Sequence, residues 1–231
     1  MENLLRQYLD TRMGKESIPI KPGGVITISR EYGCPSKILA DMLVQRINAE
    51  CKHKSGDPSA WKWIGKELLE EAAALLRVQP SDISHVYNYR ERSLVEDLLA
   101  ATRKNGSYRT DRAIRSSIAK VIRSFAENGR VVIVGRAGMA ITRQMPGSLH
   151  VRLMAPLEWR ISRISEVYSL RREEAIQTIA SKDENRRKFL EYYLGHEFRI
   201  HDFDAVFYCS TCSLEEIADS VILLIRKRSI I

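Results

Sequence analysis

Short apolar runs, each followed by a helical pattern, constrain the fold of this chain more than any other feature. The clearest runs are VITI at 25–28 and VVIV at 131–134, and shorter or mixed ones lie at 61–64, 149–154 and 205–209. Strands that are apolar on both faces are typical of parallel sheets covered on both sides. The alternation of strands with helices therefore predicts an α/β fold around a parallel sheet.

Helical periodicity and capping residues place the helices between these strands. The last helix is the best delimited, because Ser213 and Glu216 form the pattern of a capping box before 214–227. The other predicted helices begin near Ser36 and at 66, 111, 156 and 171. We expect residues 1–20 to form a helical appendage and 21–231 to form one domain. Within it, 66–128 is a helical subdomain with a further helical pattern around 90–103.

Composition and charge restrict the class of partner. Lys and Arg number 37 and Asp and Glu 29, so the formal net charge is +8, which suits anionic ligands. The first residues lack the apolar core of a signal peptide, and no apolar run approaches a membrane span. We therefore expect a cytoplasmic protein without a membrane partner, and the four cysteines as thiols. The charge would also suit nucleic acid, but no nucleic-acid motif is present, which disfavours that reading.

The loop after the first strand is the first candidate site. A phosphate loop needs small residues whose N–H groups converge on phosphate, a Lys, and a hydroxyl for Mg²⁺. Gly33, Ser36 and Lys37 lie at suitable places between strand and helix, whereas Pro35 lacks an N–H and Ile38 stands where the hydroxyl is expected. A phosphate loop and a plain strand-to-helix turn both fit these residues.

Arginines near other strand ends supply candidate anion ligands. Arg136 follows Gly135 directly after the strand 131–134, and Arg109 lies among hydroxyl residues before a long helix. Arg160 and Arg163 share one helix face, and a charged run occupies 182–188. These arginines could converge on phosphates or lie on solvated faces. Cys209 and Cys212 form a lone C-x-x-C and the histidines form no ligand pair, so we predict no protein metal site.

Several segments in order resemble the cytidylate-kinase-like family. VITISREYGCPSKILA (25–40) is similar to its first strand and phosphate loop, and VIRSFAENGRVVIVGRA (121–137) to its second signature. LHVRLMAPLEWRISRI, SKDENRRKFLEYYLG and DFDAVFYCSTCSLEEIADSVI resemble the following strand and helix, the lid, and the last strand and helix. The resemblance spans roughly residues 25–225.

The resemblance implies the P-loop kinase three-layer sandwich, with a five-stranded parallel sheet and a lid at 160–195. It implies phosphoryl transfer from ATP, with Mg²⁺, to CMP or dCMP. The implied site residues fall into three groups. Gly33, Cys34, Ser36 and Lys37 would bind ATP, Arg109 and Arg136 would hold the acceptor phosphate, and Lys37, Arg160, Asp183, Arg186 and Arg187 would be catalytic.

The chain also departs from the family pattern at the residues that matter for chemistry. Cys34 and Pro35 interrupt the glycine-rich loop, Ile38 and Leu39 replace Gly and Thr, and Ala137 stands where an Asp is expected. A nucleotide-binding pseudokinase is therefore the alternative to an active kinase. The oligomeric state stays open.

Overall fold

The computed structural model describes residues 24–53, 57, 59–65, 67–77, 79–83, 86 and 111–231. In this part of the chain, five strands form one sheet in the order β2-β3-β1-β4-β5. They are β1 (Val25–Arg30), β2 (Lys62–Ile64), β3 (Val131–Val134), β4 (Ser148–Met154) and β5 (Ala205–Tyr208). Every pairing is parallel, which confirms the predicted sheet. β1 lies between β3 and β4, where ligands of open α/β sheets bind.

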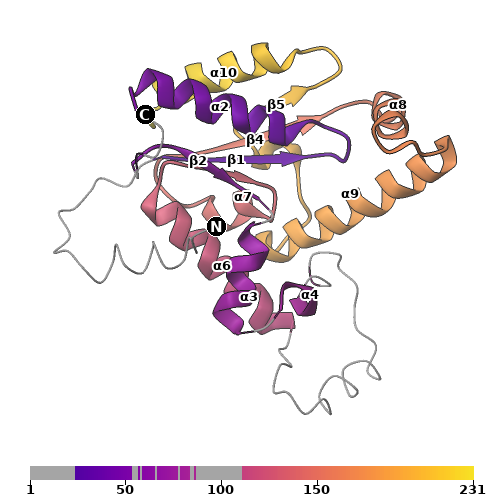
Figure 1. Ribbon diagram of the computed structural model, residues 1–231, viewed down its shortest axis with the longest axis horizontal. Coiled ribbons are helices and arrows are strands. Elements are labelled where there is room, and N and C mark those ends of the chain that lie inside the picture. The colour runs from indigo at the N-terminus through magenta and orange to yellow at the C-terminus, as the bar shows by residue number, and fades with distance from the viewer. Residues whose placement is uncertain are drawn as a thin grey trace.

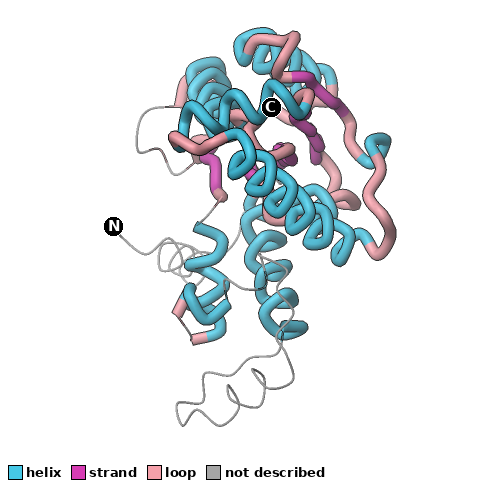
Figure 2. Tube along the Cα trace, turned by 90° about the vertical axis from the view of Figure 1, so that its right-hand side faces the viewer, coloured by secondary structure: helices cyan, strands magenta, loops and turns pink. Residues whose placement is uncertain are grey.

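Helices cover both faces of the sheet, so the domain has three layers (Figures 1 and 2). One face packs against α2 (Ser36–Glu50) and α10 (Leu214–Lys227). The other packs against α3 (Glu67–Leu76), α6 (Asp111–Asn128), α7 (Gly138–Thr142) and the C-terminal part of α9 (Arg172–Leu194). The remaining described helices are α4 (Pro80–Ile83), α8 (Leu157–Tyr168) and the 3₁₀ turn η2 (Ile200–Asp202). None of the described helices is long and apolar enough to cross a membrane.

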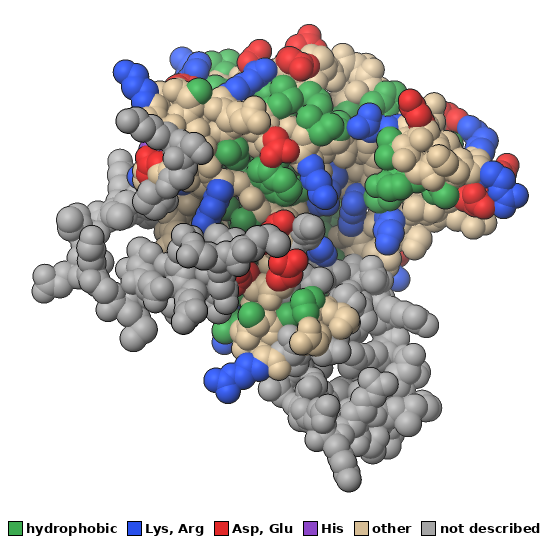
Figure 3. All heavy atoms as spheres, in the orientation of Figure 1, with side chains coloured by type: hydrophobic (Ala, Val, Ile, Leu, Met, Phe, Trp, Pro, Cys, Tyr) green, Lys and Arg blue, Asp and Glu red, His purple; other side chains and the backbone are tan. Residues whose placement is uncertain are grey.

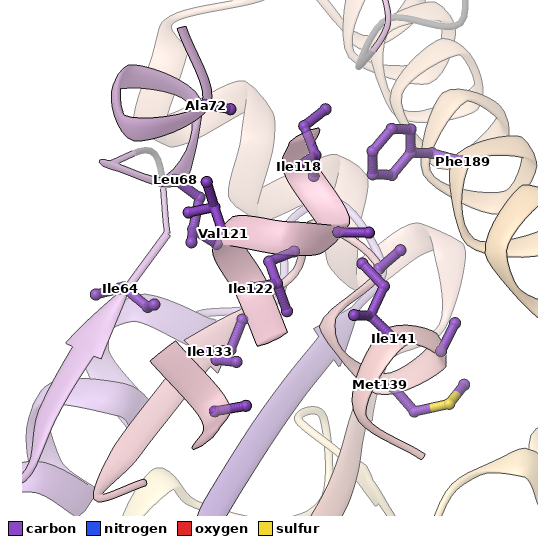
Figure 4. Packing of buried hydrophobic residues seen from close by; sticks show 14 of the residues in the cluster. Ile64, Leu68, Ala72, Ile118, Val121, Ile122, Ile133, Met139, Ile141 and Phe189 are labelled. Atoms are coloured by element: carbon purple, nitrogen blue, oxygen red, sulfur yellow. The ribbon is translucent and has the colours of Figure 1, made fainter. Parts of the chain in front are cut away.

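The apolar stripe of α6 anchors one helical layer to the sheet. Ile122 lies beside Ile133 of β3, whereas Ile118 lies nearer to Phe189 of α9 (Figure 4). Ile122 and Ile133 are fully buried, and each such side chain contributes about 1.5–3 kcal/mol of transfer free energy. Because α6 packs on β3 and α3 packs on α6, these two helices of the predicted subdomain 66–128 belong to this layer. The subdomain itself stays a prediction.

α8 and α9 form an arm beyond the carboxyl ends of the strands (Figure 1). Ile161 and Ile164 of α8 pack against Ala175 and Ile179 of α9 in a small separate core. α9 then runs back under the sheet, where Phe189 is buried in the main core. Residues 160–195, the predicted lid, fall within this arm, and their role as a lid stays a prediction.

Some sequence predictions differ from the structure or lie outside it. β1 was predicted to end at residue 28 but continues to Arg30, paired with β4. The helix predicted to begin at Pro156 begins at Leu157. The appendage 1–20, the helical pattern around 90–103 and Arg109 lie outside the described residues.

Candidate functional site

A cavity of about 620 Å³ lies at the carboxyl ends of β1 and β3, under α9. Figure 3 shows Lys and Arg side chains gathered on this face, between the sheet and the arm. The basic residues of its wall are Arg30, Arg136, Arg152, Lys182, Arg186 and Arg187, and the acidic ones are Glu31, Asp183 and Glu184. The excess of cations makes this cavity suited to an anionic ligand.

Arg30 ends β1 and lies against the turn after β3. A Cβ atom placed on Gly135 would come within 1.8 Å of the Arg30 Nη1 atom, so a larger residue there would force this guanidinium to move. Gly135 also has φ +73°, a left-handed conformation that glycine adopts without strain. Burial, followed by the nearby charges of Arg186 and Arg136, lowers the pKa of Arg30 to about 9.

The turn that carries Arg136 is left-handed over three successive residues. After Gly135, Arg136 and Ala137 have φ of 54° and 55°, a region in which non-glycine residues cost of order 1 kcal/mol or more each. The Gly138 N–H donates to the Gly135 carbonyl and closes the turn at 2.9 Å. This strained turn places Arg136 on the cavity wall.

Arg186 and Arg152 complete the cationic wall through contacts with aromatic rings. The Arg186 guanidinium lies 5.1 Å from the ring centroid of Tyr32, and that of Arg152 lies 4.3 Å from the centroid of Phe198. Burial lowers the pKa of both arginines. The Nε of Arg152 and one Nη of Arg186 are buried and donate no hydrogen bond within the described structure.

Asp183 ties the first loop to the arm. Its carboxylate accepts a hydrogen bond from the Tyr32 N–H at 2.6 Å and another from Arg160 Nη1 at 2.5 Å. Arg160 also donates to the carbonyls of Ala155 and Tyr32. Arg160 therefore connects the loop, the end of β4 and α9. The Tyr32 N–H donates to Asp183, so it is not available to a bound anion.

The rest of the loop turns into α2. Gly33 has φ +102°, and a Cβ there would lie 3.2 Å from the Arg160 Cβ. Cys34 is buried, and a hydrogen bond with the Cys209 thiol, together with burial, raises its pKa. Ser36 is buried at the start of α2, whereas Lys37 is exposed. Within the described residues the cysteines are free thiols, as predicted.

The start of α2 fits a nucleotide phosphate better than it fits a metal. No side chain caps this helix, and no described acceptor takes the N–H groups of Lys37 or Ile38. Such N–H groups, with an adjacent Lys, favour phosphate. Ile38 is 49% exposed where a metal-binding hydroxyl would stand. No described group of three His, Cys, Asp or Glu residues could hold a metal, so Mg²⁺ would depend on phosphate oxygens and water.

The predicted site residues are therefore distributed over two places. Arg136, Asp183, Arg186 and Arg187 line the cavity, while Gly33, Cys34, Ser36 and Lys37 form the loop at the start of α2. Arg187 forms ion pairs with Glu184 and Glu191 along its own helix. Arg160 lies between the two places. The roles of these residues remain predictions.

Two wall residues, Arg30 and Arg152, were not among the predicted site residues. Arg30 ends β1, in a stretch that we interpreted as the turn after the first strand, and Arg152 lies inside β4, which we interpreted only as a strand. The sequence carried one signal for them, which is the residue type. Charged side chains are rare in buried parallel strands, so an arginine there indicates a partner or a ligand.

Comparison with known proteins assigns the fold. No curated protein matches the chain significantly. The crystal structure of an uncharacterized protein from Eubacterium ventriosum ATCC 27560 is similar at 18% identity, with a TM-score of 0.62, over 89% of this chain and 99% of that one. A shikimate kinase from Bacteroides thetaiotaomicron is similar at 14% identity with a TM-score of 0.44, over 88% and 98% of the two chains. A shikimate kinase from Acinetobacter baumannii, in complex with shikimate, is similar at 10% identity with a TM-score of 0.46, over 90% of this chain and 94% of that one.

The family model of the cytidylate kinase-like family matches residues 25–211. This range runs from the first residue of β1 to beyond the last strand of the sheet. In the structure, the strands, the first loop, the turn that carries Arg136 and the arm follow one another in the order that the sequence resemblance implied. With its parallel five-stranded sheet and these loops at the strand ends, the chain belongs to the cytidylate kinase-like family and has the P-loop kinase fold.

Proposed function

We propose that this protein transfers the terminal phosphoryl group of ATP to a nucleoside monophosphate, with CMP or dCMP as the acceptor. The arginine-lined cavity beside the first loop is the observation that carries the proposal. Phosphoryl transfer needs two anionic substrates held close together and charge stabilisation between them. A cationic cavity next to the start of α2 supplies that arrangement. Use of ATP and CMP agrees with the cytoplasmic location expected from the sequence.

The donor side of the reaction would be the first loop. The N–H groups at the start of α2 and the Lys37 ammonium would bind the phosphate tail of ATP. Lys37 is exposed, and within the described structure it has no carboxylate partner, so it is available to a ligand. ATP supplies the phosphoryl group, while Mg²⁺ would be bound mainly by phosphate oxygens.

The acceptor side would be the cavity. Arg136 would bind the acceptor phosphate, and Arg186 would face the group in transfer from α9. Arg160 and Asp183 position the loop relative to α9 through the contacts described above. Because phosphoryl transfer depends mostly on positioning and electrostatics, these groups need not act as acid or base.

A nucleotide-binding pseudokinase is the second candidate. Pro35 has no N–H to donate to a phosphate, and the N–H of Tyr32 already donates to Asp183. Ile38 offers no oxygen to a metal ion. These features favour binding of nucleotide without turnover.

A coupled ADP-release assay decides between the two candidates. ATP and Mg²⁺ are supplied with CMP, dCMP, UMP, AMP or GMP, and acceptor-dependent ADP release is expected with CMP or dCMP. Lys37→Ala should abolish turnover, whereas Lys227→Ala, at an exposed lysine on α10, should not change it. ATP binding by calorimetry, without turnover on any acceptor, would support the pseudokinase instead.

A further inference from the structure

Arg30 is a charged side chain in the cavity wall without a counter-ion. Within the described structure it makes no hydrogen bond and no ion pair, although Glu31 and Asp183 line the same cavity. Arg30 is only partly buried, so part of its guanidinium stays in contact with water. Its burial still disfavours the charged form, because the described residues supply no hydrogen-bond acceptor for it.

Arg160, in the same region, shows how the protein compensates the charge of a buried arginine. Its side chain donates to two carbonyls and to the Asp183 carboxylate, and Glu31 lies 3.6 Å away. All of its charge is compensated by the protein. Arg30 lies at the end of the neighbouring strand and has none of these partners, so its role differs from that of Arg160.

The backbone around Arg30 is shaped to admit its guanidinium. Gly135 leaves the space that Nη1 occupies, since a Cβ there would be 1.8 Å away. The Gly135 N–H is bound to the Ile28 carbonyl at 2.9 Å, which fixes the turn beside β1. The turn beside the end of β1 therefore leaves room for the guanidinium in its observed position.

Most of the charged neighbours of Arg30 repel it. Arg186 and Arg136 lower its pKa and Asp183 partly opposes them, so three guanidinium groups share one region of the cavity. Within the described residues, Asp183 is the acidic side chain paired with Arg186, at 3.9 Å. Three converging cations of this kind are best compensated by a ligand group with more than one negative charge. Bidentate pairing of arginine with phosphate oxygens provides that compensation.

We propose that Arg30 is a phosphate ligand of the acceptor site and that, with Arg136 and Arg186, it selects a phosphate monoester dianion over a phosphodiester monoanion. The proposal rests on the proposed function for the identity of the acceptor, but it concerns binding and not turnover.

The experiment measures ligand binding by calorimetry. The ligands are CMP, inorganic phosphate, and 3′,5′-cyclic CMP, which keeps the base and sugar but carries a single charge. The wild-type protein should bind CMP at least about tenfold more tightly than cyclic CMP, as expected for a charge-assisted pair. Arg30→Met should weaken CMP and phosphate binding by at least about tenfold and should remove most of that preference. Arg30→Lys keeps the charge but loses the forked geometry, so its affinity for CMP should lie between those of the wild type and Arg30→Met.

Arg171→Met is the matched control, because Arg171 is exposed at the start of α9 and pairs only with Glu174 in the described structure. It should leave both affinities unchanged. The melting temperature separates a ligand role from a structural one. Arg30→Met should melt at the same temperature as the wild type or higher without ligand, because it removes an uncompensated charge.

Three outcomes would overturn the proposal. They are equal binding of CMP and cyclic CMP by the wild type, unchanged affinities in Arg30→Met, and no binding of CMP or phosphate at millimolar concentration. A lower melting temperature in Arg30→Met with unchanged ligand preference would assign Arg30 to structure. If CMP binding depends on Arg30 but no ADP is released, the proposed function fails while this inference stands.

Discussion

The contact of Asp183 with the first loop makes a quantitative prediction about stability. Asp183→Asn keeps the size of the side chain and one oxygen that can accept the Tyr32 N–H. It removes the charge opposite Arg160, whose side chain is only 10% exposed. Breaking a buried ion pair costs about 3–5 kcal/mol. Because the Asp183 side chain is 27% exposed, we expect a loss just below that range, about 2–3 kcal/mol.

Urea unfolding monitored by circular dichroism measures this loss. With a slope of about 2–3 kcal/mol per molar urea, the midpoint of Asp183→Asn should fall by about 1 M. The neighbouring Glu184→Gln is the matched control, since Glu184 pairs with Arg187 and Lys188 on the exposed face of the same helix. Its midpoint should hardly move, because exposed ion pairs contribute little. Equal midpoints for the two variants would refute the argument that Asp183 fastens the loop to α9.

Three further predictions concern the core and the cavity. Burial lowers the pKa of His150 to about 4, below the value of about 6.5 expected in the unfolded chain. Between pH 6.5 and 4 the unfolded chain therefore binds a proton that the folded chain does not, and the stability should fall by about 3 kcal/mol over that range. His150→Gln should flatten that slope in urea unfolding at each pH. Ile122→Ala should cost about 2–5 kcal/mol by the same assay, since Ile122 is fully buried against the sheet, and a loss below 1 kcal/mol would contradict this packing. Arg152→Leu should raise the urea midpoint by removing a partly buried cation that has no acidic partner in the described structure, and calorimetry should show weaker CMP binding.

Much of the fold could be predicted because its signals are local. The helix 214–227 has the predicted bounds, since the capping box of Ser213 and Glu216 fixes its start. The pattern 111–128 likewise matches α6. β1 was predicted too short because its apolar run ends at Ile28, whereas its pairing with β4 continues through Ser29 and Arg30. Hydrophobicity marks the buried part of a strand and not its hydrogen-bonded end.

The site was predictable only in part, because its geometry depends on contacts distant in sequence. The order of motifs indicated Arg136, Asp183 and Arg186, and the structure brings all three to one cavity. The observed position of the Arg30 guanidinium also involves Gly135, about a hundred residues away, because a Cβ there would displace it. No local pattern carries that information, and the polar end of a strand was interpreted as the beginning of a turn.

The same long-range contacts explain how this chain can dispense with a glycine-rich loop. A loop rich in glycine binds phosphate through its own N–H groups. Here Pro35 lacks that group and Asp183 accepts the N–H of Tyr32, so side chains from α8 and α9 define the loop instead. Asp183 and Arg186 lie three residues apart on α9, one bound to the loop and the other facing the cavity. Movement of α9 must therefore change the loop and the cationic wall together, and a ligand that displaces Asp183 from Tyr32 alters both sites at once.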